Sequence, residues 1–294
     1  PEDADEITDD LMQAANMSDA SQPVALGTSK WDQSDVMMIT YGDSIKKEGR
    51  APLKELNNFV VRELKDTISG VHILPFSPYS SDDGFSVIDY TAVNPELGTW
   101  EDIAEIGKEF DIMGDLVINH CSRESVWFKN YIKNKAPGRG YFINGSEFED
   151  LSQVVRPRST PLLTEVECVD GVKQVWCTFG EDQVDLNYRN PDVLLEIVRI
   201  IRYYVDQGIR FFRLDAIAFL WKESGSTCVH LPQTHELIKL LRIVIETLEP
   251  TAVIITETNV PNRENLSYFG NDNEAHLIYN FSLPPLLLNA LLSS

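Results

Sequence analysis

The sequence has no hydrophobic run long enough to cross a membrane, and it has few cysteines. None of its apolar stretches reaches the roughly 18 residues that a membrane-spanning helix needs, and its first residues lack the pattern of a signal peptide. Its four cysteines stand at no spacing typical of a metal site, and in a chain of 294 residues they make no disulfide framework. We therefore expect a soluble, cytoplasmic protein that uses no metal and no cofactor.

Basic residues are also scarce. The chain has 25 Lys and Arg against 46 Asp and Glu, which gives a formal net charge of −21 at pH 7. This balance disfavours nucleic acid as a partner, although a local basic pocket can still bind an anionic substrate. Since 43% of the residues are hydrophobic, the chain can bury a sizeable core. We expect small-molecule partners, and neither nucleic acid nor a membrane.

From Trp31 onward, strand-like apolar runs alternate with amphipathic helical runs. The strand-like runs cover residues 36–41, 70–76, 112–120, 209–214, 252–257 and 276–281, and the helical runs cover residues 53–64, 99–110, 193–207, 235–248 and 283–292. This alternation predicts an α/β fold of parallel βαβ units. Because a TIM-type (β/α)8 barrel has eight units, we expect such a barrel to be truncated here after about six.

Residues 121–185 interrupt the alternation. They are irregular, contain several prolines and hold one β-like run at 172–179. The stretch is too long for an ordinary loop, so it predicts a small inserted domain after the third strand. The expected division is an N-terminal arm at 1–30, a first part of the catalytic barrel at 31–120, the inserted domain at 121–185 and a second, incomplete barrel part at 186–294.

Polar residues gather at the C-terminal ends of three predicted strands: Asn119 with His120, Arg213 with Asp215, and Glu257 with Asn259. Alternation along a strand places Arg213 and Asp215 on one face, where Arg213 is expected to lower the pKa of Asp215 and keep it ionised. Each pair alone is also typical of a structural ion pair or a capping network. Three such pairs lie at the end of the sheet where barrel enzymes have their active sites, and this favours a catalytic role over a structural one. Asp215 and Glu257 would suit cleavage of a glycosidic bond with retention of configuration, one carboxylate attacking the anomeric carbon and one acid protonating the leaving oxygen.

Several segments resemble the signature segments of the α-amylase superfamily of glycoside hydrolases. They are residues 115–120 (DLVINH), 183–187 (QVDLN), 213–216 (RLDA) and Glu257 after VIIT. Residues 80–90, 156–158 (RPR) and 281–288 resemble the sucrose phosphorylase branch of this superfamily, and residues 256–261 (TETNVP) look closest to its glucosylglycerate phosphorylase type. Sucrose phosphorylases carry His at the position of Asn259, which argues against sucrose as the donor.

The resemblance implies a role for each matching residue. Asp215 would be the nucleophile and Glu257 the general acid and base. The implied substrate-binding residues are Asp82, His120 and Arg213 around the glucose unit, Phe85 as an aromatic platform, Arg158 at the phosphate, and Asn259 on the acceptor side. Asp185 and Asn187 are expected to anchor the inserted domain rather than to touch substrate.

The resulting hypothesis is a retaining glucosyl phosphorylase. It would transfer glucose from an α-glucoside of glycerate, glycerol or fructose to phosphate, through a covalent glucosyl-Asp intermediate, and release α-glucose 1-phosphate. The alternatives are an α-glucoside hydrolase or transglucosylase of the same superfamily, and an inactive truncated barrel that binds sugar or a partner chain. The superfamily also has a third catalytic acid after its seventh strand, beyond the sequence in hand. With open strand edges, we expect the chain to self-associate.

Overall fold

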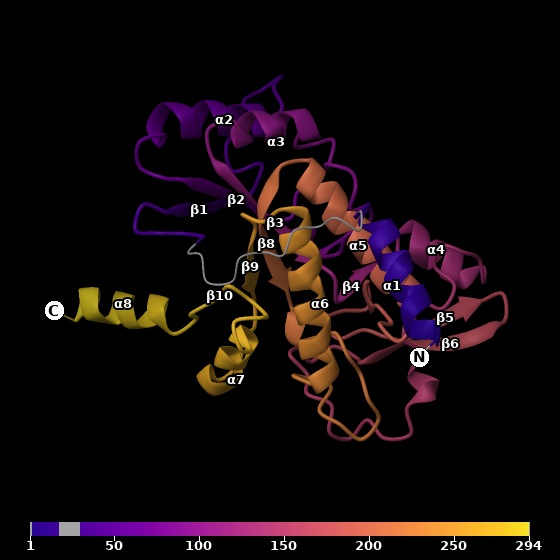
Figure 1. Cartoon of the computed structure of the whole chain (residues 1–294). Helices are drawn as coiled ribbons and strands as arrows, with labels where there is room; N and C mark the ends of the chain where they lie inside the picture. Colours follow the sequence, from indigo (N-terminus) through magenta and orange to yellow (C-terminus); the bar gives the residue numbers. More distant parts are fainter. Residues whose placement is uncertain (1, 18–29, 294) are drawn as a thin grey trace.

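The computed structural model describes residues 2–17 and 30–293, and a six-stranded sheet lies at its centre (Figure 1). The strand order is β1-β2-β3-β8-β9-β10, and each neighbouring pair is parallel. The strands are β1 (Met37–Thr40), β2 (Gly70–Ile73), β3 (Asp111–Val117), β8 (Ile209–Asp215), β9 (Val253–Thr256) and β10 (Leu277–Ile278). The parallel βα alternation predicted from the sequence is thus confirmed, while β10 is much shorter than the run at 276–281.

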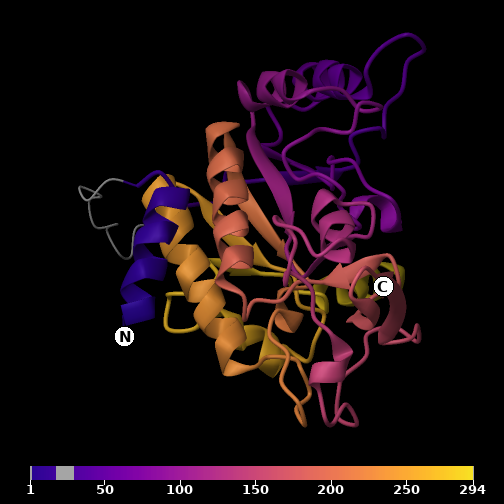
Figure 2. The same ribbon diagram turned by 90° about the vertical axis from the view of Figure 1, so that its right-hand side faces the viewer.

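Helices cover the outer face of this sheet. They are α2 (Pro52–Glu63), α3 (Trp100–Gly107), α5 (Pro191–Asp206) and α6 (Pro232–Leu248). Each is amphipathic, and its buried apolar residues join one core cluster with the outward side chains of the strands, such as Phe212 and Leu214 of β8. Figures 1 and 2 show α5 and α6 side by side against the sheet.

The inner face of the sheet carries a smaller apolar cluster and the charged strand ends. Met113, Phe211, Val253 and Ile255 form that cluster. Because side chains alternate along β8, Phe211, Arg213 and Asp215 share this inner face. The helices packed on the outer face therefore stabilise the sheet, and the inner face is available for a binding or active site.

Residues 120–185 form two small antiparallel ladders beside the sheet. The elements are β4 (His120–Ser122), α4 (Val126–Ile132), β5 (Leu163–Cys168), β6 (Gly171–Trp176) and β7 (Gln183–Asp185). The predicted β-like run at 172–179 corresponds to β6, whereas its hairpin partner β5 and helix α4 were not predicted. Strand β4 pairs with β7, with His120 opposite Asp185, so the segment returns to the point where it left the sheet.

The ends of the described chain differ in how they pack. Helix α1 (Glu2–Ala14) lies against α5, and Arg202 of α5 donates a hydrogen bond to the carbonyl of Ala15. Residues 18–29 of the predicted N-terminal arm lie outside the described residues. After the short helix α7 (Asn262–Leu266), helix α8 (Leu283–Leu292) extends away from the sheet and has no buried residue (Figure 1). No helix in the described part of the chain is long and apolar enough to span a membrane.

Candidate active site

A pocket of about 310 Å³ lies at the C-terminal ends of the parallel strands. Its lining comes from loops after β1, β2 and β3, from the ends of β8 and β9, and from the segment 120–185. The lining residues are Tyr41, Asp82, Asp83, Phe85, His120, Arg158, Phe179, Gln183, Arg213, Asp215, Ala216 and Glu257. The structure therefore brings together every site residue predicted from the sequence except Asn259.

Asn259 is exposed and does not line the pocket. Glu257 faces the pocket, and the next side chain, Thr258, turns away into the protein and donates a hydrogen bond to Asn265 over 2.6 Å. The loop that follows carries Asn259 to the surface. Its expected position on the acceptor side is thus not reproduced as a pocket contact.

Arg213 lies at the centre of the charged groups in the pocket. Its Nη1 donates to Asp215 Oδ1 over 2.8 Å and also to Asp115 Oδ1. Asp115 is itself buried and bonds His72 Nε2 through its other oxygen, over 2.8 Å. The guanidinium carbon stands 5.6 Å from the centre of the Phe85 ring, within the range of a cation–π contact. Arg213 is therefore shared between two carboxylates, and sequence reasoning had not identified Asp115 as the second.

The expectation that Arg213 holds the pKa of Asp215 low is wrong in its net direction. Burial raises the pKa of Asp215 to about 7, and the negative charges of Glu257 and Asp115 add to this rise, while Arg213 opposes it. The physical reason is that Asp115 compensates much of the Arg213 charge, so the cation offsets only part of the cost of desolvating Asp215.

A hydrogen bond from the backbone next to Asp215 holds the Glu257 carboxyl near Asp215. The amide of Ala216, directly after Asp215, donates to Glu257 Oε2 over 3.2 Å. Ala216 has a φ of 50°, a left-handed conformation that is uncommon for a residue with a side chain. The turn after β8 thus directs a backbone N–H towards the carboxyl at the end of the neighbouring strand and keeps the two acids next to one another.

His120 is buried, and its ring has a partner on each nitrogen. Asn119 Nδ2 donates to His120 Nδ1 over 3.2 Å, which leaves the proton on Nε2, and Nε2 lies 2.9 Å from the carbonyl oxygen of Phe85. Burial lowers the pKa of His120 and favours the neutral ring. His120 therefore fixes the backbone of Phe85 as well as lining the pocket.

The carboxylate of Asp82 is held from the segment 120–185. Gln183 Nε2 donates to Asp82 Oδ2 over 2.9 Å, and Arg158 Nη2 lies 3.4 Å from the same oxygen. About half of the Arg158 side chain is exposed, so it can reorient toward a ligand. Gln183 and Phe179 were missed from the sequence, although Gln183 begins the signature-like segment 183–187.

A buried network around Asp185 links segment 120–185 to the sheet, and Asp185 does not line the pocket. Lys222 Nζ lies 2.6 Å from Asp185 Oδ2 and donates to Asn119 Oδ1 over 2.9 Å and to the carbonyl of Phe219. Thr178 donates to Asp185 through both its amide and its hydroxyl. Because every donor of the ammonium has an oxygen partner, this charge is tolerated in the interior.

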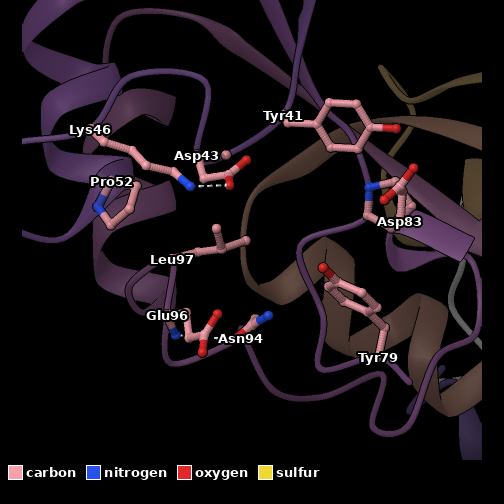
Figure 3. A pocket seen from close by; sticks show the side chains of 11 residues that line it. Tyr41, Asp43, Lys46, Pro52, Tyr79, Asp83, Asn94, Glu96 and Leu97 are labelled. Atoms are coloured by element: carbon pink, nitrogen blue, oxygen red, sulfur yellow. Dashed lines mark hydrogen bonds and ion pairs between the residues drawn. The ribbon is translucent and has the colours of Figure 1, made fainter. Parts of the chain in front are cut away.

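A second pocket of about 410 Å³ adjoins the first and shares Tyr41 and Asp83 with it. Figure 3 shows Asp83 between the rings of Tyr41 and Tyr79. Among the residues that line this second pocket, Lys46 is the one cation, and it is paired with Asp43 over 2.8 Å. The other lining residues are acidic or neutral. Within residues 2–17 and 30–293, no cluster of three His, Cys, Asp or Glu side chains is arranged to hold a metal ion.

Comparisons with known proteins relate most of the chain to one family. A model of the alpha amylase catalytic domain matches residues 64–291. A glucosylglycerate phosphorylase of Spirochaeta thermophila is 53% identical over 268 residues, which are 91% of this chain and 46% of that protein. A sucrose phosphorylase of Bifidobacterium adolescentis is 31% identical over 270 residues, covering 88% of this chain and 52% of that protein.

A solved structure supports the same relationship. The crystal structure of sucrose 6F-phosphate phosphorylase from Thermoanaerobacter thermosaccharolyticum superposes with a TM-score of 0.81 at 27% identity, over 93% of this chain and 56% of that chain. The chain thus spans about half the length of the curated relatives it matches.

Proposed function

The chain belongs to the alpha amylase catalytic-domain family, and from this premise we propose that the whole protein is a retaining glucosyl phosphorylase. It transfers glucose from an α-glucoside of a small polar aglycone, with glucosylglycerate as the first candidate, to inorganic phosphate. The observation that carries this proposal is one pocket in which two carboxyl groups from neighbouring strands, Asp215 and Glu257, meet beside Arg213. The similarity to a glucosylglycerate phosphorylase over 91% of the chain supports glucosylglycerate as the donor.

The reaction proceeds in two displacements. In the first, an oxygen of ionised Asp215 attacks the anomeric carbon, the glycosidic bond breaks, and Glu257 gives its proton to the leaving oxygen of the aglycone. In the second, Glu257 takes a proton from phosphate, and a phosphate oxygen displaces Asp215 from the same carbon. Two inversions restore the α configuration, so the product is α-glucose 1-phosphate.

The other lining residues bind and shield the sugar in this proposal. Asp82, His120 and Arg213 bind hydroxyl groups of the glucosyl unit, and the apolar ring of Phe85 covers the covalent intermediate from water. Arg158 receives the phosphate, because a guanidinium offers paired donors to an anion and this side chain is half exposed at the rim. A role for Asn259 in the choice of aglycone stays a prediction.

The architecture of the whole protein is part of the proposal. The six parallel strands are those of a (β/α)8 barrel, and residues 121–185 are a small domain inserted after its third strand. Support comes from the sequential order of the strands in the sheet and from the solved phosphorylase structure, which this chain covers for 56% of its length. A cytoplasmic location stays a prediction from the sequence.

Phosphate dependence separates this proposal from its alternatives. We define the extended chain as this sequence joined at its C-terminus to whatever part of the Spirochaeta thermophila relative follows the matched region. With glucosylglycerate and phosphate, the extended chain is expected to release α-glucose 1-phosphate faster than free glucose. Free glucose released equally well without phosphate would indicate a hydrolase, and binding of glucose without turnover would indicate a binding module. This chain alone, assayed in parallel, is expected to be inactive or nearly so.

A further inference from the structure

The turn that carries Asp82 and Phe85 has an unusual backbone. Asp82, Asp83 and Gly84 have φ values of 55°, 50° and 108°, so three consecutive residues are on the left-handed side. Residues with a Cβ rarely adopt this conformation, and it persists only where surrounding contacts hold it. At Gly84 a Cβ would come within 2.7 Å of Pro75, so the turn is also pressed close to the preceding chain.

One carboxylate holds both sides of this turn. Asp182 Oδ2 accepts hydrogen bonds from the hydroxyl groups of Ser80 over 2.5 Å, Ser81 over 2.6 Å and Ser86 over 2.8 Å. Ser80 and Ser81 come directly before the turn, and Ser86 comes directly after it. A single oxygen therefore joins the chain segments that lead into and out of the strained residues.

Asp182 and Ser80 are also hydrogen-bonded to β4 and to the residue that follows it. The Asp182 carbonyl oxygen accepts from the amide of Arg123 over 3.2 Å, and the hydroxyl of buried Ser122 lies 2.5 Å from that of Ser80. Burial pushes the pKa of Asp182 upward, but the hydrogen bonds from the three serine hydroxyls and from the backbone of Arg123 together outweigh burial, and the net pKa lies below the ordinary value. The carboxylate thus remains charged and remains a strong acceptor.

We propose that Asp182 is a positioning residue of the active site. Through Ser80, Ser81 and Ser86 it holds the left-handed turn in place, and the turn presents the Asp82 carboxylate and the Phe85 ring to the pocket. Asp182 does not itself line the pocket. The inference rests on the proposed function only in assigning Asp82 and Phe85 to the glucosyl unit.

Hydrogen exchange of the turn tests the proposal without any activity assay. In Asp182→Ala, the amides of Ser80, Phe85 and Ile88, which are bonded within the turn, are expected to exchange at least about tenfold faster, while amides of β3 and β8 keep their rates. Asp170→Asn changes an exposed aspartate that is paired with Lys173 in the same segment; it is the control and is expected to leave the exchange rates of the turn at residues 80–88 unchanged. Unchanged exchange in the turn, or an equal increase throughout the chain, would overturn the proposal.

Relief of the backbone strain provides a specific rescue. Glycine adopts positive φ without steric cost, so Asp83→Gly lowers the tendency of the turn to open. In the Asp83→Gly background, Asp182→Ala is expected to accelerate exchange of the turn by less than about threefold. A full tenfold effect in that background would show that Asp182 does not act on the strained turn.

Kinetics in the extended chain complete the test. Asp182→Ala is expected to raise KM for glucosylglycerate about tenfold and to change kcat less, because the sugar-binding groups lose their position while Asp215 and Glu257 keep theirs. A fall in kcat with KM unchanged would contradict the assignment. The two proposals can also fail separately. If Asp182→Ala accelerates hydrogen exchange in the turn but the parent extended chain shows no phosphorolysis, Asp182 still positions the turn and the proposed function is wrong.

Discussion

The carboxyl of Asp215 is buried beside Arg213, Asp115 and Glu257, and burial dominates its titration. A pKa of about 7 means that a sizeable fraction of the Asp215 carboxyl is protonated at neutral pH. In the proposed mechanism Asp215 attacks as an anion, so its protonated form cannot take part in the first displacement. The proposed reaction therefore depends on the ionised fraction, and its rate is expected to rise with pH up to about 7.

Removal of the proposed nucleophile, Asp215, is the first prediction at this scale. Asp215→Asn keeps the size of the side chain and removes its ability to form a glucosyl ester. In the extended chain we expect phosphorolysis to fall by at least about 10³-fold, as is typical when a covalent nucleophile is lost. Circular dichroism of the variant should match that of the parent, and residual activity above about 1% of the parent would refute Asp215 as nucleophile.

The pH dependence of the stability of Asp215→Asn tests whether the Asp215 carboxyl is buried. The folded pKa of about 7 lies above the ordinary value of 3.8, so between these pH values the folded chain binds more protons than the unfolded chain. The free energy of unfolding then decreases as pH rises through this window. The neutral Asn lacks this titration, so urea unfolding should show the stability of Asp215→Asn relative to the parent increasing from pH 4.5 to pH 7.5, by about 3 kcal/mol. An equal difference at both pH values would show that the carboxyl is not desolvated.

At the scale of elements, Lys222 connects three parts of the fold. Its ammonium joins Asn119 after β3, Asp185 of β7 and the carbonyl of Phe219 in the turn after β8. Lys222→Met would leave the Asp185 carboxylate buried without its cation, and we expect unfolding to become easier by about 3–5 kcal/mol. Urea denaturation measures this loss.

A double variant separates the charge effect from packing. In Lys222→Met with Asp185→Asn, no uncompensated charge remains, so much of the lost stability should return. Lys108→Met, which removes an exposed lysine paired with Glu105, is the control and should change stability by less than about 1 kcal/mol. A double variant as unstable as the single one would show that the ion pair is not the cause.

The elements also show which features of the fold follow from sequence. Strands such as β3 and β8 were predictable because their buried runs are long and apolar and their ends are polar, and α8 was predicted with its observed bounds. Strands β4 and β7 of segment 120–185 were not predictable, because they have three residues each and form only through pairing over some sixty residues of chain. Gln183 and Asp115 were missed as site residues for a related reason: each acts through contacts with residues distant in the sequence, such as Asp82 and Arg213. The residue type at one position does not reveal such contacts.

At the scale of the whole molecule, apolar surface is exposed at the end of the sheet. Helix α8 presents leucines on all sides, among them Leu286, Leu287 and Leu291 at 55–67% exposure, and β1 and β10 are the edges of the parallel sheet. The inner face beside these edges forms an open apolar hollow of about 390 Å³ lined by residues such as Met37, Ile255 and Leu277. Surfaces of this kind promote association.

We therefore predict that this chain self-associates in solution. Sedimentation velocity should show species larger than the monomer at micromolar concentration, and Leu287→Lys combined with Leu291→Lys should shift the distribution toward the monomer. The matched control is Lys substitution of Val169 and Val172, which are exposed on the β5–β6 hairpin away from α8. A parent chain that sediments as a single monomer at these concentrations would contradict the prediction.

The central claim is that Asp215 forms a covalent bond to glucose, and trapping that bond tests it most directly. A fluorinated α-glucosyl fluoride supplies a good leaving group and slows the second displacement, so the glucosyl enzyme accumulates. After brief incubation of the extended chain and proteolysis, mass spectrometry should find the fluoroglucosyl mass on the peptide that contains Asp215, and added phosphate should remove it. Attachment to another residue, or turnover of the reagent with no labelled peptide at any time, would contradict the account.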